Sequence, residues 1–256
     1  MKQHIDTIPV WEAYQADCEC PLCRIRLKNE AMYVDNFLGA SVMEPSTRVE
    51  VNQKGFCQRH FQMMFDSGNR LGLALLCHTY LKETMAKLDK DAQAAREAAA
   101  GEAGKSIFAR VGGKKAEGVQ AAIDSAREIA GKCILCERLD ATMDRYVYTL
   151  IYMWKHESEF RAAFEKSKGF CLNHYAQVLA QAQKDLSGKE LKQFVDMLCD
   201  LQKQNLERIE KEIEWFTLKF DYRNQSKPWG NSQDAVERTI NKLRGACVGD
   251  LKIPEE

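Results

Sequence analysis

The sequence has no excess charge of either sign and no long apolar run. Its 256 residues include 37 lysines and arginines and 37 aspartates and glutamates, so the formal net charge is zero. Recruitment of nucleic acid or of an anionic membrane relies on a positive field, so either would need a local basic patch. The longest strongly apolar stretch, residues 146–154, is too short to span a bilayer. These absences disfavour nucleic acid as a partner and argue against a membrane protein.

The N-terminal residues, MKQHIDTIP, contain no apolar run that could act as a signal peptide. We therefore expect a cytoplasmic protein. In that reducing compartment, ten cysteines are expected to be metal ligands and core residues rather than a disulfide framework. The sequence also lacks a nucleophile–base pair and a phosphate-binding motif, so it predicts no catalytic residue and favours a protein that is not an enzyme.

One pattern of cysteine and histidine occurs twice. Cys20-Pro-Leu-Cys23 is followed by Gly55-Phe-Cys57-Gln-Arg-His60, and Cys133-Ile-Leu-Cys136 is followed by Gly169-Phe-Cys171-Leu-Asn-His174. Each copy offers three thiols and one imidazole, which form the ligand set of a tetrahedral zinc site. The predicted metal ligands are Cys20, Cys23, Cys57, His60, Cys133, Cys136, Cys171 and His174.

We expect each copy to bind its own metal ion, so that the ligands of the first site precede residue 61 and those of the second follow residue 132. The sequence predicts two zinc ions, and an iron–sulfur cluster is the alternative that the ligand types allow. Because the protein fills all four coordination positions of each site, the metals are expected to be structural rather than catalytic.

The spacing between the copies predicts an internal duplication. Cys20 and Cys133 are 113 residues apart, and Cys57 and Cys171 are 114 residues apart. We predict a mostly α-helical protein with two similar helical halves, each with a Cys3His site, and a long helix with a C-terminal extension. The predicted boundaries are 1–100 for the first repeat, 101–118 for a flexible basic linker, 119–188 for the second repeat and 189–256 for the extension.

Helix signals are clear in most of the chain. Apolar residues recur every three or four positions after Cys23 up to Gly39, in residues 139–154 and in residues 191–220. Thr7 is expected to cap a helix that begins near Pro9, and Asn231 or Ser232 to cap a last helix that ends at Gly245. Residues 41–54 contain Pro45 and an alternating pattern, so they are expected to be extended or irregular.

The residues beside the two predicted sites differ in charge. Arg24, Arg26 and Arg59 lie close in sequence to the first site, and Cys18 is a spare thiol near it. The second site has Asn173 in the place of Arg59. We therefore expect the first site to be the more electropositive and the one at which any thiol chemistry occurs. Whether Cys18 is reactive or exchanges with a ligand is left open.

Several short segments together resemble a bacterial family. They are Thr7-Ile-Pro9, Cys20-Pro-Leu-Cys-Arg24, Gly55-Phe-Cys-x-x-His60, Asn69-Arg-Leu-Gly-Leu73 and Asp221-Tyr-Arg with Pro228-Trp-Gly230. With them the chain resembles, over nearly its whole length, a domain of unknown function with paired CxxC and GFCxxH elements. The resemblance implies a bacterial cytosolic protein and brings no known activity.

The sequence favours a zinc-binding interaction or scaffold module with a protein partner that it does not identify. The first alternative is a redox-responsive or metal-responsive protein, with a reactive thiol at the first site or with iron–sulfur clusters. The second alternative is weak nucleic-acid binding through the basic residues of segment 105–115. No oligomeric state is predicted.

Overall fold

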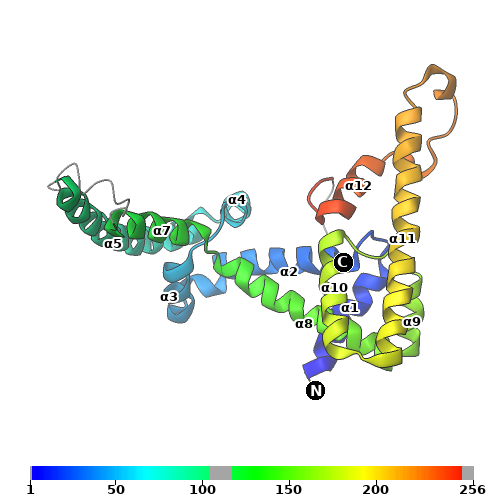
Figure 1. Ribbon diagram of the computed structural model, residues 1–256, viewed down its shortest axis with the longest axis horizontal. Coiled ribbons are helices and arrows are strands. Elements are labelled where there is room, and N and C mark those ends of the chain that lie inside the picture. The colour runs from blue at the N-terminus through cyan, green and yellow to red at the C-terminus, as the bar shows by residue number, and fades with distance from the viewer. Residues whose placement is uncertain (1, 104–116, 250–256) are drawn as a thin grey trace. The chain divides into compact units, whose positions relative to one another are not determined.

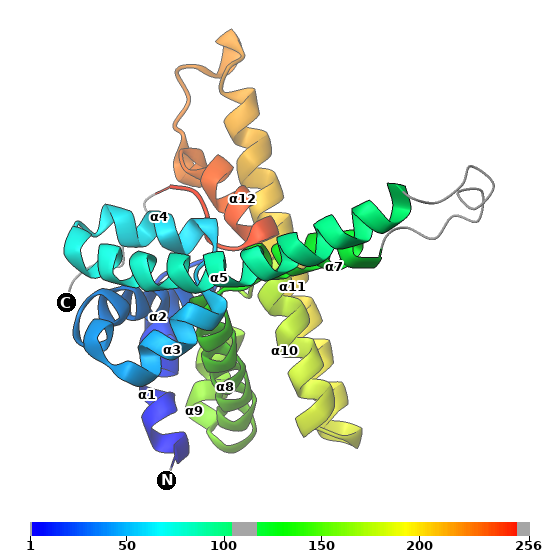
Figure 2. The ribbon, with the colours of Figure 1, turned by 90° about the vertical axis from the view of Figure 1, so that its left-hand side faces the viewer.

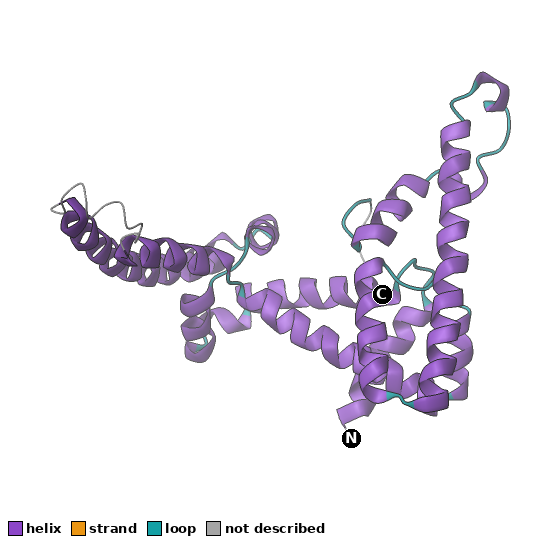
Figure 3. Cartoon of the chain, viewed as in Figure 1, coloured by secondary structure: helices purple, strands orange, loops and turns teal. Residues whose placement is uncertain are grey.

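The computed structural model describes residues 2–103 and 117–249, and every regular element in these ranges is a helix (Figure 3). The predicted mostly α-helical class is therefore confirmed. Within the same ranges, no helix has a stretch that is both long and apolar enough to cross a membrane. The basic segment 105–115 lies outside the described residues.

The described chain divides into two compact units. Residues 1–29 and 140–256 form unit 1, and residues 30–139 form unit 2. The chain passes between the units within α2 (Pro21–Leu38) and again within α8 (Ile134–His156). The other helices of unit 1 are α1 (Lys2–Gln15), α9 (Ser158–Glu165), α10 (Leu172–Asp185), α11 (Gly188–Leu218), η2 (Tyr222–Asn224), η3 (Gly230–Ser232) and α12 (Ala235–Arg244). Those of unit 2 are η1 (Ala40–Met43), α3 (Pro45–Lys54), α4 (Gln58–Asp66), α5 (Arg70–Ala103) and α7 (Glu117–Gly131).

Aromatic side chains form the core of unit 1. Phe164 on α9 is fully buried, and its ring lies 5.7 Å from the ring of Phe170 and 5.7 Å from that of Phe194 on α11. Helices α10 and α11 lie side by side over this core (Figure 1). Because Phe170 is the residue before Cys171, the core also holds the segment that carries this predicted ligand.

Unit 2 repeats this arrangement around its own Gly-Phe-Cys segment. The Phe56 ring is buried, 5.2 Å from the ring of Phe37 on α2 and 5.5 Å from that of Phe61 on α4. Helices α5 and α7 lie side by side in two views of the molecule (Figures 1 and 2). The phenylalanine before each Cys-x-x-His pair is therefore a core residue in its unit.

The prediction for residues 41–54 was wrong, because they form η1 and α3 rather than an extended segment. Pro45 is the first residue of α3, where a missing N–H costs no helical hydrogen bond and a fixed φ suits the helix. The side chain of Val51, on this helix, is fully buried. The proline that we interpreted as a sign of an extended or irregular segment therefore starts a helix.

Two helix starts also differ from the predictions. Helix α1 begins at Lys2 and contains Pro9 in its interior, so it starts earlier than the predicted position near Pro9. A proline removes only one backbone hydrogen bond, and here the helix continues through it. Helix α12 begins at Ala235 after Asp234, not at Asn231 or Ser232, because residues 230–232 form η3. Its predicted end at Gly245, with a φ of 90°, is confirmed.

The internal duplication and the boundaries at residues 100, 118 and 188 stay predictions. Gly55 and Gly169, which precede the two Phe-Cys pairs, share a left-handed φ, 61° and 72° respectively. Such local likeness is what a duplication predicts, but two compact units that divide at residues 29 and 139 do not test it.

Candidate metal centres

The two Gly-Phe-Cys segments turn the chain sharply into a helix. The left-handed φ of Gly55 and Gly169 suits glycine, and the following cysteines, Cys57 and Cys171, occupy the N-cap positions of α4 and α10 with extended backbone. His60 and His174 follow three residues later, so that each histidine lies about one turn along its helix. A thiolate at the N-terminus of a helix is stabilised by the helix dipole.

The two Cys-x-x-Cys pairs lie at the starts of helices. Cys20 directly precedes α2 and Cys133 directly precedes α8. The backbone N–H of Cys136 points to the sulfur of Cys133, with 3.4 Å between the nitrogen and Sγ. This first turn brings both sulfurs of a pair to one side of the helix end, where a second pair can complete a four-ligand site.

The structure groups the eight residues into two clusters. Cluster A consists of Cys20, Cys23, Cys171 and His174 and lies in unit 1. Cluster B consists of Cys57, His60, Cys133 and Cys136 and lies in unit 2. In each cluster the four ligand atoms lie within 4.8 Å of one another, so all eight predicted residues are brought into groups that could hold a metal ion.

The predicted partnership of the pairs was wrong. We expected Cys20 and Cys23 to join Cys57 and His60, but they join the Cys-x-x-His pair of the second copy. The pairs are therefore crossed: the first Cys-x-x-Cys pair meets the last pair of the chain, and the two middle pairs meet each other. The physical reason is that each Gly-Phe-Cys segment packs into the core of its own unit, and that core contains the other copy's Cys-x-x-Cys helix end.

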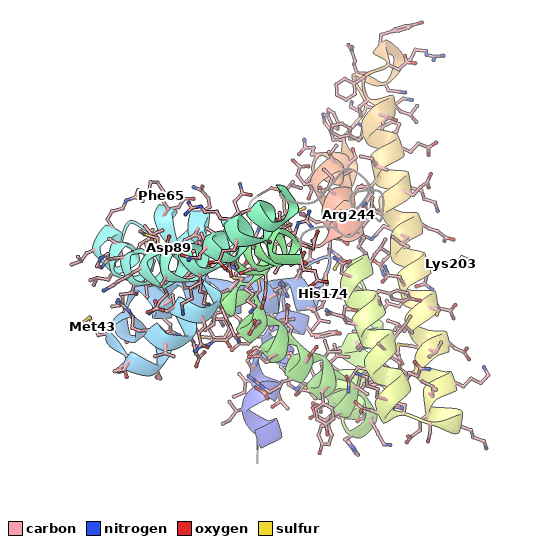
Figure 4. The ribbon with its side chains drawn as sticks, turned by 60° about the vertical axis from the view of Figure 1, so that its left-hand side comes forward. Met43, Phe65, Asp89, His174, Lys203 and Arg244 are labelled. Carbon is pink, nitrogen blue, oxygen red and sulfur yellow. The ribbon has the colours of Figure 1, made fainter. Side chains whose placement is uncertain are left out.

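Cluster A is entirely buried. The Nδ1 atom of His174 lies 3.3 Å from the sulfur of Cys171 and 3.4 Å from those of Cys20 and Cys23. The sulfurs of Cys23 and Cys171 are 3.6 Å apart. Figure 4 shows His174 on α10 in this unit. A disulfide would require a sulfur–sulfur distance of about 2 Å, so these thiols are not cross-linked.

Cluster B has the same geometry. The Nδ1 atom of His60 lies 3.2 Å from the sulfurs of Cys57 and Cys133 and 3.5 Å from that of Cys136. The sulfurs of Cys57 and Cys136 are 3.8 Å apart. His60 and Cys133 are buried, whereas Cys57 and Cys136 are partly exposed. Cluster B is therefore the more accessible of the two.

These separations match those of a tetrahedral zinc site. With zinc–sulfur bonds of about 2.3 Å and zinc–nitrogen bonds of about 2.0 Å, tetrahedral angles place two sulfurs about 3.8 Å apart. A sulfur and a nitrogen then lie about 3.5 Å apart. The observed sulfur–sulfur distances are 3.6 and 3.8 Å and the sulfur–nitrogen distances 3.2–3.5 Å. Both clusters thus have room for one ion of zinc size at their centre.

Within each cluster, the pKa of one thiol is lowered while that of a neighbouring thiol is raised. In cluster A, burial raises the pKa of Cys20 well above its ordinary value and a hydrogen bond with Cys171 raises that of Cys23 to about 12, whereas hydrogen bonds with Cys20 and Cys23 lower the pKa of Cys171. In cluster B, burial and the neighbouring Cys133 raise the pKa of Cys136. Although burial alone would raise it, hydrogen bonds with His60 and the N–H of Cys136 lower the pKa of Cys133 to about 6. Three thiolates within 4.8 Å of one another would repel strongly, and a divalent cation offsets this repulsion. The donor chemistry of both clusters therefore suits a metal ion.

A buried carboxylate orients the histidine of cluster B. Glu30 on α2 is 3 % exposed, and its Oε1 lies 3.0 Å from His60 Nε2, on the far side of the ring from the sulfurs. Arg59 donates two hydrogen bonds to the same carboxylate, at 2.8 and 2.7 Å. Although burial alone would raise the pKa of Glu30, the bonds from Arg59 and His60 lower it to about 2. A carboxylate in this place fixes the imidazole tautomer and strengthens the ligand.

Sequence reasoning missed Glu30, because no motif links it to His60, thirty residues away. The structure also separates the charges that we assigned to one site. Arg59 belongs with cluster B, whereas Arg24 and Cys18 lie with cluster A. Cys18 donates to the carbonyl of Ala13 at 3.7 Å and is not among the ligands of either cluster. No single site combines all of these arginines with the spare thiol, so the grouping on which we based the contrast between the sites was wrong. The contrast in charge and reactivity itself stays a prediction.

Cluster A is enclosed by contacts from the C-terminal helices. Gln202 on α11 is buried, and its side chain accepts from the N–H of Phe170 at 3.1 Å and donates to the carbonyl of Phe170 at 2.9 Å. Lys242 on α12 is 1 % exposed and donates to the carbonyls of Glu19, at 2.9 Å, and Lys168. Each carbonyl belongs to a loop that leads to a cluster A cysteine. Both side chains therefore hold the ligand loops in place.

The segment after α12 reaches the cluster itself. The N–H of Ala246 points to the sulfur of Cys23, with 3.4 Å between nitrogen and sulfur. Asn173 on α10 donates to the carbonyl of Arg244 at 3.3 Å, and Figure 4 shows Arg244 at the end of α12. A hydrogen bond from a backbone N–H to a coordinating thiolate disperses its charge. The sequence gives no signal for these contacts, which depend on the tertiary fold.

Replacing Glu30 by glutamine should lower the metal affinity of cluster B by about 10- to 100-fold and leave cluster A unchanged. Glutamine keeps the shape of the side chain, but it lacks the negative charge that faces His60 and Arg59. Competition with a chromophoric chelator measures the effect, because one of two bound ions should be lost earlier. Glu50→Gln is the matched control, since Glu50 lies in the same unit and pairs with Arg138 rather than with a ligand histidine. An equal loss of metal affinity in the two variants would contradict the role assigned to Glu30.

Comparison with known proteins agrees with the predicted resemblance. The profile of the "Family of unknown function (DUF6062)" matches residues 1–250. The chain is also 23 % identical over 223 residues to a protein of Caldicellulosiruptor sp. (strain Rt8B.4), described as "Uncharacterized 23.9 kDa protein in xynA 3'region". That match covers 86 % of this chain and 95 % of the relative. No solved structure matches the chain. The chain therefore belongs to the family of unknown function DUF6062, as the paired CxxC and GFCxxH elements predicted.

Proposed function

We propose that this protein binds two zinc ions at structural Cys3His sites and acts as an interaction or scaffold module for a protein partner in the cytoplasm. The observation that supports it best is the make-up of the clusters. Each brings four protein ligand atoms within 4.8 Å of one another, and these atoms come from segments that are far apart in the sequence. A site with four protein ligands has no open position for a substrate, which is typical of structural zinc.

The two metals fasten different parts of the fold. Cluster A ties the start of α2 to the start of α10, and its residues Cys23 and His174 are 151 positions apart. Cluster B ties the start of α4 to the start of α8, and its residues His60 and Cys133 are 73 positions apart. Metal binding at such sites contributes directly to folding stability. Each compact unit therefore has one metal ion of its own, and both can present their surfaces as stable bodies.

The metal content of the purified protein tests the proposal. We expect elemental mass spectrometry to find two zinc ions per chain, and we expect the protein to be colourless after anaerobic purification. A brown protein with iron and acid-labile sulfide would support the iron–sulfur alternative instead. A chain with one metal ion or none, after purification without chelators, would contradict the structural role of at least one cluster.

A redox-responsive role is the second candidate, because Cys18, Cys20 and Cys23 line one cavity together. Oxidation requires a thiolate, however, and burial raises the pKa of Cys18. Zinc release during peroxide treatment separates the candidates. A structural site keeps its metal at peroxide concentrations that release zinc from a redox switch. Release that disappears in a Cys18→Ser variant would favour the redox role.

A further inference from the structure

A cavity of about 750 Å³ lies beside cluster A in unit 1. Its wall includes the ligands Cys20 and Cys23, the first turns of α2, part of α11 and the segment from η3 to α12. This volume is in the range of small-molecule sites, which are concave and carry a few fixed polar groups. The metal-site proposal uses only the cysteines of this wall, so the remaining side chains have no assigned role.

One side of the cavity is a fixed network of ion pairs. Arg208 on α11 contacts Glu19 at 2.6 Å and Glu212 at 3.0 Å. Arg238 on α12 contacts Asp234 at 2.8 Å and also pairs with Glu212. Both arginines therefore have carboxylate partners already, and the network holds this wall in one conformation. Such a wall is organised before any ligand binds.

Two groups in the cavity have bonding capacity left for a ligand. The guanidinium of Arg24 has no ion pair or side-chain hydrogen bond with any described residue. Asp234 pairs with Arg238 through Oδ1, and its Oδ2 receives no hydrogen bond from the described residues. Its side chain is 66 % exposed, so a ligand in the cavity can reach this oxygen. A ligand that donates to Asp234 and accepts from Arg24 would satisfy both.

The lining also limits the chemistry of the ligand. It contains four cations and four anions, namely Arg24, Lys168, Arg208 and Arg238 with Asp17, Glu19, Glu212 and Asp234. Three thiolates on a divalent metal would add about one negative charge beside them. A polyanion such as a nucleotide would therefore be repelled, and the described lining has no aromatic side chain on which a base could stack. A ligand with one charge of each sign fits better.

We infer that this cavity binds a small zwitterion with an amine and a carboxylate, such as a free amino acid or a short peptide. Arg24 holds the carboxylate, whereas Lys168 already pairs with Asp17. Asp234, at the end of the ion-pair network, holds the amine through Oδ2. The volume exceeds that of one amino acid, so there is room for a side chain or a second residue. These charges surround the cavity whichever metal cluster A contains.

Binding of defined zwitterions to the full-length protein tests this assignment. The twenty standard amino acids and a set of dipeptides are screened by thermal shift, and the best compound is titrated by calorimetry. We expect at least one to bind, and analogues without the amine or without the carboxylate to bind about tenfold more weakly or worse. Tighter binding of amino acids points to a free metabolite, and tighter binding of dipeptides points to a peptide terminus. If no compound binds, or if ATP or a single-charge analogue binds as tightly, the assignment is wrong.

Two arginines of α2 provide a matched pair of variants. Arg24→Ala should weaken binding by about tenfold or more, and Arg24→Lys should restore part of the affinity. Arg26 lies two residues away, pairs with Asp140 at 2.9 Å and does not line the cavity, so Arg26→Ala should bind like the natural protein. Equal losses in the two alanine variants would contradict the role of Arg24. The analogue comparison needs no variant, and metal content separates a failed ligand site from a failed metal site.

Discussion

Replacing Cys20 and Cys171 together by serine should remove one bound metal ion per chain, whereas replacing Cys20 and Cys57 together should remove both. Cys20 and Cys171 belong to cluster A, so the second substitution damages a site that the first has already damaged. Cys57 belongs to cluster B, so the other double variant damages both sites. Serine removes the thiolate but keeps the side chain almost the same size. The measurement is metal content per chain after purification at equal metal exposure.

The same pair of variants tests the crossed partnership directly. If each Cys-x-x-Cys pair instead shared a metal with the Cys-x-x-His pair of its own copy, the two results would be reversed. The Cys20/Cys171 variant would then lose both ions and the Cys20/Cys57 variant would lose one. A Cys199→Ser/Cys247→Ser variant is the control, because both residues are exposed and lie outside the clusters. It should keep two ions. A control with fewer ions than the natural protein would mean that general damage, not ligand loss, determines the counts.

The effect on stability should be large and confined to the unit that has lost its metal. Apparent free energies of zinc binding to structural sites reach about 10–16 kcal/mol, so losing one ligand removes a large share of the stability of a unit. The Cys20/Cys171 variant should therefore show two unfolding steps in which the earlier one reports on unit 1. Hydrogen exchange identifies the step, because α10 belongs to unit 1 and α4 to unit 2.

The ligands could be predicted from the sequence because their chemistry is local. A glycine with positive φ, a phenylalanine for the core and a cysteine at the start of a helix follow one another at fixed spacing in both copies. Each of these requirements concerns one or two neighbouring residues, and the structure confirms the resulting helix starts. The periodic segments after Cys23 and Cys136 are also helices. Apolar residues that recur every three or four positions lie on one face of a helix, and that face is the one that packs into the core.

The partnership of the pairs could not be predicted in the same way, because it rests on a weak preference. We paired each Cys-x-x-Cys with the next Cys-x-x-His, which favours the shorter loop. Cys23 and His60 are 37 positions apart, whereas Cys23 and His174 are 151 apart. Closure entropy rises only with the logarithm of loop length, so the longer loop costs about 1 kcal/mol more. Burial of Phe56 and Phe170 in separate cores easily outweighs this difference.

Gly55→Ala should destabilise unit 2 by about 4 kcal/mol or more, far beyond the usual effect of adding one methyl group. Gly55 has a φ of 61° and a ψ of −156°, a backbone conformation that is essentially restricted to glycine. A Cβ atom at this position would also lie 2.5 Å from Oη and 2.7 Å from Cε1 of Tyr80 on α5. Backbone strain and steric overlap therefore act together. Urea unfolding of the metal-bound protein measures the loss.

Gly68→Ala in the same unit separates these two causes. Gly68 also has a left-handed φ, 87°, but no atom lies within 4 Å of the position of its added Cβ. The Gly68→Ala variant should therefore lose only the stability that backbone strain removes, about 1–2 kcal/mol. In a Tyr80→Ala background the overlap disappears, and Gly55→Ala should become less destabilising by about 1–3 kcal/mol. An unchanged penalty in that background would assign the whole effect to the backbone.

The position of Gly55 links this strain to the metal. The carbonyl of Gly55 accepts a hydrogen bond from the N–H of Ile134 at 3.0 Å, and Ile134 follows the ligand Cys133 directly. On the other side of the turn, Cys57 caps α4. A shift of this backbone to relieve the overlap would thus move two ligands of cluster B apart. Gly55→Ala should accordingly release the cluster B metal to a chelator sooner than the natural protein does, whereas Gly68→Ala should keep it. If both variants retained the metal equally well, the ligands would tolerate the backbone shift.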